Sequence, residues 1–173
     1  ERLLSSDTKE DLDRLSHILN RFQNSSVGEL VSKNVLKSVV TRFLTKTAGL
    51  KESEISFTQE EALKGGIKYH YGDLDLSHLT SAEGLKLPEE IGGRLDLRGL
   101  TSAKGLTLPK SIGGALNLSR LTSAKGLKLP EIIGKDLSLS GLTSAEGLKL
   151  PKSVGGTLIL SRLTSVEIGR AHV

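Results

Sequence analysis

The stretch LTSAEGLKLPEEIGGRLDLRG, from Leu79 to Gly99, sets out a unit of 21 residues that the chain then repeats. The unit occurs four times and begins a fifth time without insertions, at Leu79, Leu100, Leu121, Leu142 and Leu163. A fixed period in this range is typical of arrays in which each unit stacks on the one before it. The sequence therefore predicts a repeat solenoid with one coil per 21 residues.

Two short alternating apolar runs in each unit predict two strands per coil. In the first unit these runs are Leu85 with Leu87, and then Leu95 with Leu97. All four prolines of the chain occupy one column, which begins with Pro88 after the first run. Because proline cannot continue a hydrogen-bonded ladder, we expect the first strand to end there.

Glycine recurs in two columns, which we expect to be corners of the coil. The first column contains Gly84, Gly105, Gly126 and Gly147. The second contains Gly92, Gly113, Gly134 and Gly155. Because glycine adopts positive φ at little steric cost, positive φ is expected in both columns. A neighbouring column, in which an ordinary backbone is expected, is looser and reads Gly93, Gly114, Lys135 and Gly156.

One coil cannot bury its leucines alone, whereas coils stacked at a spacing of roughly 4.8 Å give each leucine a like neighbour above and below. Each buried leucine contributes on the order of 1.5–3 kcal/mol, against about 1.5 kcal/mol of ordering entropy for every residue fixed. The array is therefore expected to fold as a cooperative unit.

The span AEGLKLPEEI, from Ala82 to Ile91, fits the frame L-x-x-L-x-L with alanine in the first place. It resembles bacterial leucine-rich repeats, and the longer pattern LTSAxGLxLPxxIGGxLxLSGLTSA is similar to arrays in bacterial and phage proteins. The resemblance covers about half of the chain. It implies either a leucine-rich-repeat-like horseshoe or a straighter β-solenoid with two strands per coil. The column where that family has asparagine or cysteine departs from it, reading His78, Gly99, Arg120, Gly141 and Arg162.

Residues 1–57 are expected to form a helical segment or cap. Apolar residues at spacings of three and four predict a first helix from Asp7 to about Asn24. A second pattern predicts a helix from Leu30 to a C-terminal stop at Gly49. We expect the two helices to pair as an antiparallel hairpin.

Residues 58–165 are expected to form the solenoid, which begins with a short helix and a half coil. Thr58 and Glu61 predict a capping box for that helix. Because an open solenoid end exposes strand edges and leucines, we expect the helical hairpin to cap this end. The alternative is that the hairpin is the tail of an upstream domain.

Both ends of the chain suggest a fragment. The segment EIGRAHV, from Glu167 to Val173, breaks the repeat register and resembles a translated sequencing adapter, so residues 166–173 are expected to be a non-native tail. The start at Glu1 without methionine suggests a truncated N-terminus. The cellular localisation is therefore not predicted.

Composition excludes several classes of function. The 173 residues include no cysteine, which excludes disulfides and thiolate metal sites. Three Phe, two Tyr and no Trp disfavour a base-stacking platform for single-stranded nucleic acid. The net charge of +4 is spread thinly, so we expect neither a nucleic-acid nor a membrane partner. No signal peptide or membrane-spanning run is visible in the sequence.

The histidines and acidic residues form no recognised catalytic or metal-binding pattern. The eight-residue separation of His70 and His78 is not a ligand spacing, so surface or edge positions are expected for them. Asp73 and Asp75 could hold Ca²⁺ or perform acid–base chemistry, but a solvated face is the preferred interpretation. We expect no catalytic residue, no metal, no cofactor and no enzymatic activity.

Two polar columns indicate contacts between coils. Opposite charges alternate along Glu89, Lys110, Glu131 and Lys152, which predicts ion pairs between adjacent coils. Threonine recurs at Thr80, Thr101, Thr122, Thr143 and Thr164. Hydroxyls bonded to the backbone of neighbouring coils explain this column, and an ice-binding threonine array is the remote alternative.

These observations predict a non-enzymatic repeat scaffold whose outward face binds an unidentified protein or a carbohydrate. The candidate binding residues lie in columns that change between coils while the apolar columns do not: Arg94, Asp96, Arg98, Asn117, Arg120, Asp136 and Arg162. The alternative is a structural spacer or filament that self-associates through an uncapped C-terminal edge.

Overall fold

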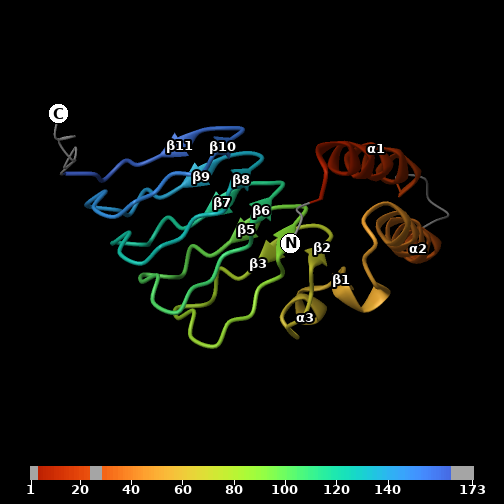
Figure 1. Ribbon diagram of the computed structural model, residues 1–173, viewed down its shortest axis with the longest axis horizontal. Coiled ribbons are helices and arrows are strands. Elements are labelled where there is room, and N and C mark those ends of the chain that lie inside the picture. The colour runs from red at the N-terminus through yellow and green to blue at the C-terminus, as the bar shows by residue number, and fades with distance from the viewer. Residues whose placement is uncertain (1–3, 24–28, 165–173) are drawn as a thin grey trace.

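The computed structural model describes residues 4–23 and 29–164, and its central feature is a β-solenoid with two parallel sheets (Figure 1). Sheet A has six strands, in the spatial order β1 (Ile55–Ser56), β2 (Tyr69–His70), β4 (Glu90–Ile91), β6 (Ser111–Ile112), β8 (Ile132–Ile133) and β10 (Ser153–Val154). Sheet B has five strands, in the order β3 (Leu74–Asp75), β5 (Leu95–Asp96), β7 (Leu116–Asn117), β9 (Leu137–Ser138) and β11 (Leu158–Ile159). The expected tail at 166–173 lies outside the described residues.

Equivalent residues of successive coils pair in register. Ile91 pairs with Ile112 in sheet A, and Leu95 pairs with Leu116 in sheet B, so each partner lies one repeat further along the chain. This pairing confirms both the 21-residue period and the two strands per coil. Of the two architectures left open by the sequence, the two-strand β-solenoid is therefore the one that forms.

The core runs through the inside of the stack, where the repeated leucines and isoleucines meet. The side chains of Leu95, Leu97 and Leu100 are 0% exposed, and their equivalents in the next coil are at most 1% exposed. Alternation along each short strand places one residue inward and its neighbour outward. The predicted stacking of like leucines is confirmed.

The predicted position of the first strand in each coil is wrong. Leu85 and Leu87 are half-buried and lie outside any strand, and the strand begins at Glu90, two residues after Pro88. The chain turns at Gly84, where the N–H of Leu85 donates to the carbonyl three residues back at 3.1 Å. Proline thus precedes the strand, where its missing N–H removes no ladder bond.

The two glycine columns have different physical causes. The first has positive φ, as predicted, with values of 73–78° at Gly84, Gly105, Gly126 and Gly147. The second lacks positive φ, so the prediction for it is wrong. An added Cβ at Gly113 would overlap the carbonyl oxygen of Gly92 in the preceding coil, and Gly134 and Gly155 repeat this conflict. Glycine occupies the second column because neighbouring coils approach too closely for a side chain.

The N-terminal segment contains the two predicted long helices, α1 (Ser6–Gln23) and α2 (Glu29–Thr47). The N–H of Thr8 donates to Ser5 Oγ at 3.2 Å, so α1 is capped two residues before the predicted start at Asp7. After α2, Gly49 has a φ of 66° and stops the helix as predicted. Neither long helix combines the length and hydropathy needed to cross a membrane.

Two short helical turns, η1 (Glu52–Glu54) and α3 (Gln59–Ala62), connect this segment to the coils. The predicted capping box of α3 is confirmed, since the N–H of Glu61 donates to Thr58 Oγ1 at 3.2 Å. Ala62 is fully buried in the solenoid core. α3 therefore closes the first coil from its end.

The helices α1 and α2 lie beside the outward face of sheet A (Figure 1). Leu12, Val40 and Leu44 form an apolar cluster with Ile55 and Tyr69 of the sheet. The hairpin thus sits at the first coils, as expected, but it covers their side. The end of the stack is covered by α3.

A polar contact extends this packing along the sheet. Lys9 Nζ lies 2.8 Å from Ser111 Oγ and 3.2 Å from Glu90 Oε2. The backbone N–H of Leu4 donates to Glu90 Oε1 at 2.8 Å. The bond from Leu4 and the ion pair with Lys9 offset part of the cost of burying the Glu90 carboxylate, which is 9% exposed and whose Oε2 accepts no hydrogen bond from the described residues.

Candidate binding face on sheet B

The outward face of sheet B carries the residues that vary between coils. The second residue of each strand points away from the core, in the column Asp75, Asp96, Asn117, Ser138 and Ile159. Within the described ranges, both long helices lie on the side of sheet A (Figure 1). The sheet B face is therefore the open broad face of this part of the solenoid.

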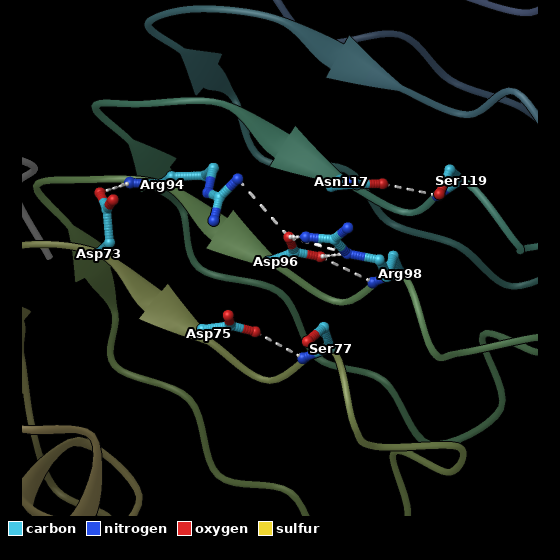
Figure 2. Close-up of polar contacts among 8 residues, drawn as sticks. All are labelled: Asp73, Asp75, Ser77, Arg94, Asp96, Arg98, Asn117 and Ser119. Atoms are coloured by element: carbon cyan, nitrogen blue, oxygen red, sulfur yellow. Dashed lines mark hydrogen bonds and ion pairs between the residues drawn. The ribbon is translucent and has the colours of Figure 1, made fainter.

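Side chains in this column close the ends of their own strands. The backbone N–H of Ser77 donates to Asp75 Oδ1 at 3.0 Å, and the N–H of Ser119 donates to Asn117 Oδ1 at 3.0 Å (Figure 2). Such side-chain bonds to the backbone two residues on are typical of Asx turns. The pKa of Asp75 is lowered chiefly by the hydrogen bonds from Ser77. The positive charges of Arg94 and Arg98 lower it further. The column has a structural role in addition to facing outward.

Asp96 makes the same turn but is not itself a surface residue. Its side chain is 0% exposed, and it accepts bonds from the backbone N–H of Arg98 at 3.1 Å and from the guanidinium of Arg98 (Figure 2). Arg94 Nη1 lies 3.7 Å from Asp96 Oδ2 on the other side. In this arrangement the Asp96 carboxylate is covered and holds the two arginines in place.

Asp73 and Asp136 bind the coil that follows them. Asp73 Oδ1 accepts the backbone N–H of Arg94 at 2.7 Å, and Asp136 Oδ1 accepts that of Thr157 at 2.7 Å. An added Cβ at Gly93 would overlap Asp73 Oδ1, and one at Gly156 would overlap Asp136 Oδ1. Each of these aspartates is therefore followed by a glycine in the next coil, which sequence reasoning missed, and close backbone atoms favour glycine there as well. The sequence contains a sign of this relation. Lys135 is the exception in the glycine column, and it follows a coil that has Ala115 at the position of the aspartate.

The arginines of the predicted site remain on the surface. The side chains of Arg94 and Arg98 are 44% and 50% exposed, and Arg120 and Arg162 are also exposed. Arg120 and Arg162 alternate with Gly99 and Gly141, where an added Cβ would overlap carbonyl oxygens of the preceding coil. The face thus presents separated guanidinium groups above a tightly packed backbone.

The other polar columns have the inter-coil bonds that were predicted. Lys110 Nζ lies 3.0 Å from Glu89 Oε2, and Lys152 Nζ lies 2.7 Å from Glu131 Oε2. The threonine hydroxyls donate to the threonine carbonyl of the preceding coil at 3.0–3.4 Å, at Thr122, Thr143 and Thr164. This confirms the hydroxyl ladder.

His70 is buried, which corrects its expected place at the surface or an edge. Its exposure is 1%, and it takes the inward position that isoleucine holds in the next three coils. Nδ1 lies 2.9 Å from Ser56 Oγ, and Nε2 lies 3.2 Å from the carbonyl oxygen of Asp73. Burial lowers the pKa of His70, so the imidazole is neutral at pH 7.

Within the described residues, no group of three histidine or acidic side chains is placed to hold a metal ion. Comparison with protein-family models, curated proteins and solved structures finds no match for this chain. The function is therefore argued from the geometry of the outward faces.

Proposed function

We propose that this chain is a non-enzymatic repeat scaffold whose sheet B face binds an acidic protein segment. The observation that carries the proposal is the unequal use of charges on this face. Asp75, Asp96 and Asp136 accept bonds from the chain's own backbone, whereas Arg120 and Arg162 have no ion-pair partner among the described residues. The groups available to a partner are therefore mainly guanidinium donors.

The spacing of these donors suits an extended chain. Arg120 and Arg162 lie two coils apart in one column, which is roughly 10 Å at the strand spacing of a sheet. Residues three apart in an extended peptide span about the same distance. Because guanidinium groups bind carboxylates in a bidentate manner, a segment with acidic residues at this interval would match the face.

Selection from a displayed library of random peptides tests this proposal. The wild-type chain serves as bait, with counter-selection on the variant Arg94→Gln/Arg120→Gln/Arg162→Gln. We expect the enriched peptides to be acidic and to bind the variant at least about tenfold more weakly, because each lost bidentate pair costs on the order of 1.4 kcal/mol or more. Binding should also weaken as salt rises.

A matched variant removes the same charge from exposed lysines elsewhere on the coils: Lys104→Gln/Lys125→Gln/Lys128→Gln. Equal losses in both variants would mean that net charge, and not the sheet B face, drives binding. Enrichment of neutral peptides would contradict the proposal. Self-association through the last coil stays a separate prediction, and gel filtration over a range of concentrations tests it.

A further inference from the structure

A groove lies between the helical hairpin and the corner of the solenoid that follows sheet A. Its volume is about 720 Å³, within the range of pockets that bind small molecules. One wall is formed by α1 and α2, with Leu12 and Leu36, and the other by backbone at Gly72, Gly92 and Gly93. Because these glycines have no side chains, a ligand could approach the backbone closely.

Aromatic side chains line this groove to an unusual degree for the chain. Phe57, Tyr69 and Tyr71 line it, out of only five aromatic residues in the whole sequence. The rings of Phe57 and Tyr71 are 5.8 Å apart and tilted by 42°, so they do not stack flat on each other. Lys37 Nζ lies 5.5 Å from the centre of the Phe57 ring. The groove therefore offers aromatic surface together with polar groups.

The hydroxyl of Tyr69 has no hydrogen-bond partner among the described residues and is not one of the fully enclosed polar atoms, so a ligand in the groove can reach it. The residue is 5% exposed, and its hydroxyl abuts Gly92, where an added Cβ would overlap it. Burial raises the pKa of Tyr69, so the hydroxyl remains protonated and able to donate. A ligand that accepts a hydrogen bond from this hydroxyl would take the place of solvent there.

The charges around the groove nearly cancel. Lys9 pairs with Glu90 at 3.2 Å, and Lys37 pairs with Glu61 at 3.4 Å. The remaining charged groups in the lining are Lys33, Asp13 and Asp73. The groove therefore presents hydrogen-bond donors and acceptors on both walls. Its charges do not strongly favour a cation or an anion as the ligand.

We propose that this groove binds a neutral oligosaccharide. Apolar C–H faces of pyranose rings pack against aromatic rings, whose faces carry partial negative charge. Sugar hydroxyls both donate and accept, so they match Tyr69 and Lys33 as donors and Asp13 and Asp73 as acceptors. The site is separate from the sheet B face and does not depend on the function proposed for that face.

Isothermal titration calorimetry with the full chain tests this site. The probes are neutral tetrasaccharides of glucose, mannose and N-acetylglucosamine, with tetragalacturonate and tetralysine as charged comparators. We expect at least one neutral probe to bind in the millimolar range or tighter, and more tightly than either charged probe. Tyr69→Phe and Lys33→Gln should each weaken binding by about tenfold, since the first removes a hydrogen-bond donor and the second replaces a charged donor by a weaker neutral one.

The controls are Lys46→Gln on α2 and Asp11→Asn on α1, which lie on the same helices outside the groove lining. They should bind like the wild type, as should Arg120→Gln on the sheet B side. Lys33 is exposed, so its variant keeps the test valid even if Tyr69→Phe proves unstable. Failure of every neutral probe, tighter binding of a charged one, or equal binding by the groove variants would overturn the proposal.

Discussion

On sheet A the outward residues of three successive rungs, Tyr69, Glu90 and Ser111, are buried beside the helices, whereas on sheet B the outward residues bond to their own turns. The inward leucines and isoleucines of both sheets are alike. The difference shows that the repeated inward residues determine how the coils stack. The outward residues, which vary between coils, determine what each face contacts. A buried carboxylate such as Glu90 needs a partner from outside the repeat, and α1 supplies it.

The corners after the two sheets differ in the same way. After sheet A, three successive coils pass through Gly113, Gly134 and Gly155, where an added Cβ would overlap a carbonyl oxygen of the preceding coil. After sheet B this conflict occurs only in alternate coils, at Gly99 and Gly141. After sheet B an Asx turn such as that of Asn117 ends the strand, with solvent beside it. We therefore expect changes on the sheet A side to cost more than changes on the sheet B side.

The largest effect is expected for Gly134→Ala in the corner after sheet A. The new Cβ would overlap the carbonyl oxygen of Gly113, and a backbone atom in a stacked coil cannot move aside easily. We expect a loss of about 3 kcal/mol or more in the free energy of unfolding, measured with urea.

The matched control is Gly126→Ala, in open space with a φ of 78°. It should cost only about 1 kcal/mol, from the strain of positive φ. If the two variants were equally stable, close approach between coils would not be the reason for glycine in the second column.

The next effect concerns the bond between α1 and sheet A. Lys9→Met would leave the Glu90 carboxylate, which is 9% exposed, with the N–H of Leu4 as its remaining partner among the bonds described. We expect the free energy of unfolding to fall by about 2 kcal/mol. Adding Glu90→Met should restore most of this, because an apolar pair removes the unpaired charge.

Arg94→Met gives the corresponding change on sheet B. Asp96 keeps its bonds from Arg98, so the loss should be smaller than for Lys9→Met. A larger loss for Arg94→Met would reverse the comparison between the two faces.

The periodicity of the sequence was sufficient to predict which residues point into the core of the solenoid. Leu95 and Leu97 alternate, recur every 21 residues, and are buried as expected. The first strand was misplaced because Leu85 and Leu87 alternate equally well, and alternation alone does not show which run reaches the neighbouring coil. Only inter-coil hydrogen bonds distinguish them, and these belong to the folded stack.

The candidate site was predictable only in part. The variable columns were found, but the burial of Asp96 depends on how Arg94 and Arg98 fold over it. Likewise, a glycine that recurs in every repeat can provide positive φ or leave room for a carbonyl oxygen. The sequence alone does not distinguish these two roles. The groove could not be predicted at all, because it depends on how two helices dock against residues distant in the sequence.

A smaller effect should appear on acidification, through His70 in the first rungs of sheet A. Burial lowers the pKa of His70 from its ordinary 6.5, so the unfolded chain binds a proton more readily than the folded one. The contribution of neutral His70 to the free energy of unfolding is therefore complete above about pH 6.5. It decreases as the pH falls, by up to roughly 1.4 kcal/mol per pH unit.

Urea unfolding between about pH 7 and 5.5 measures the slope of the free energy of unfolding against pH. In this range histidine is the side chain expected to titrate. His70→Ile, which introduces the residue found at this position in the next three coils, should flatten this slope. The exposed His78 provides the control, because His78→Gln should leave the slope unchanged. A slope that survives in His70→Ile would assign the pH dependence to another group.

The smallest effect is expected for Asn117→Ala on the open face. The variant loses one bond, from the N–H of Ser119 to Asn117 Oδ1 at 3.0 Å, and solvent can replace it because Ser119 is only half-buried. We expect a loss of about 0.5–1 kcal/mol in the free energy of unfolding. Asn117→Asp should retain the bond, since aspartate forms it at the equivalent position Asp75. If Asn117→Ala cost as much as Gly134→Ala, turns on sheet B would be as important to the stack as the glycine corner, and the contrast between the two sides would fail.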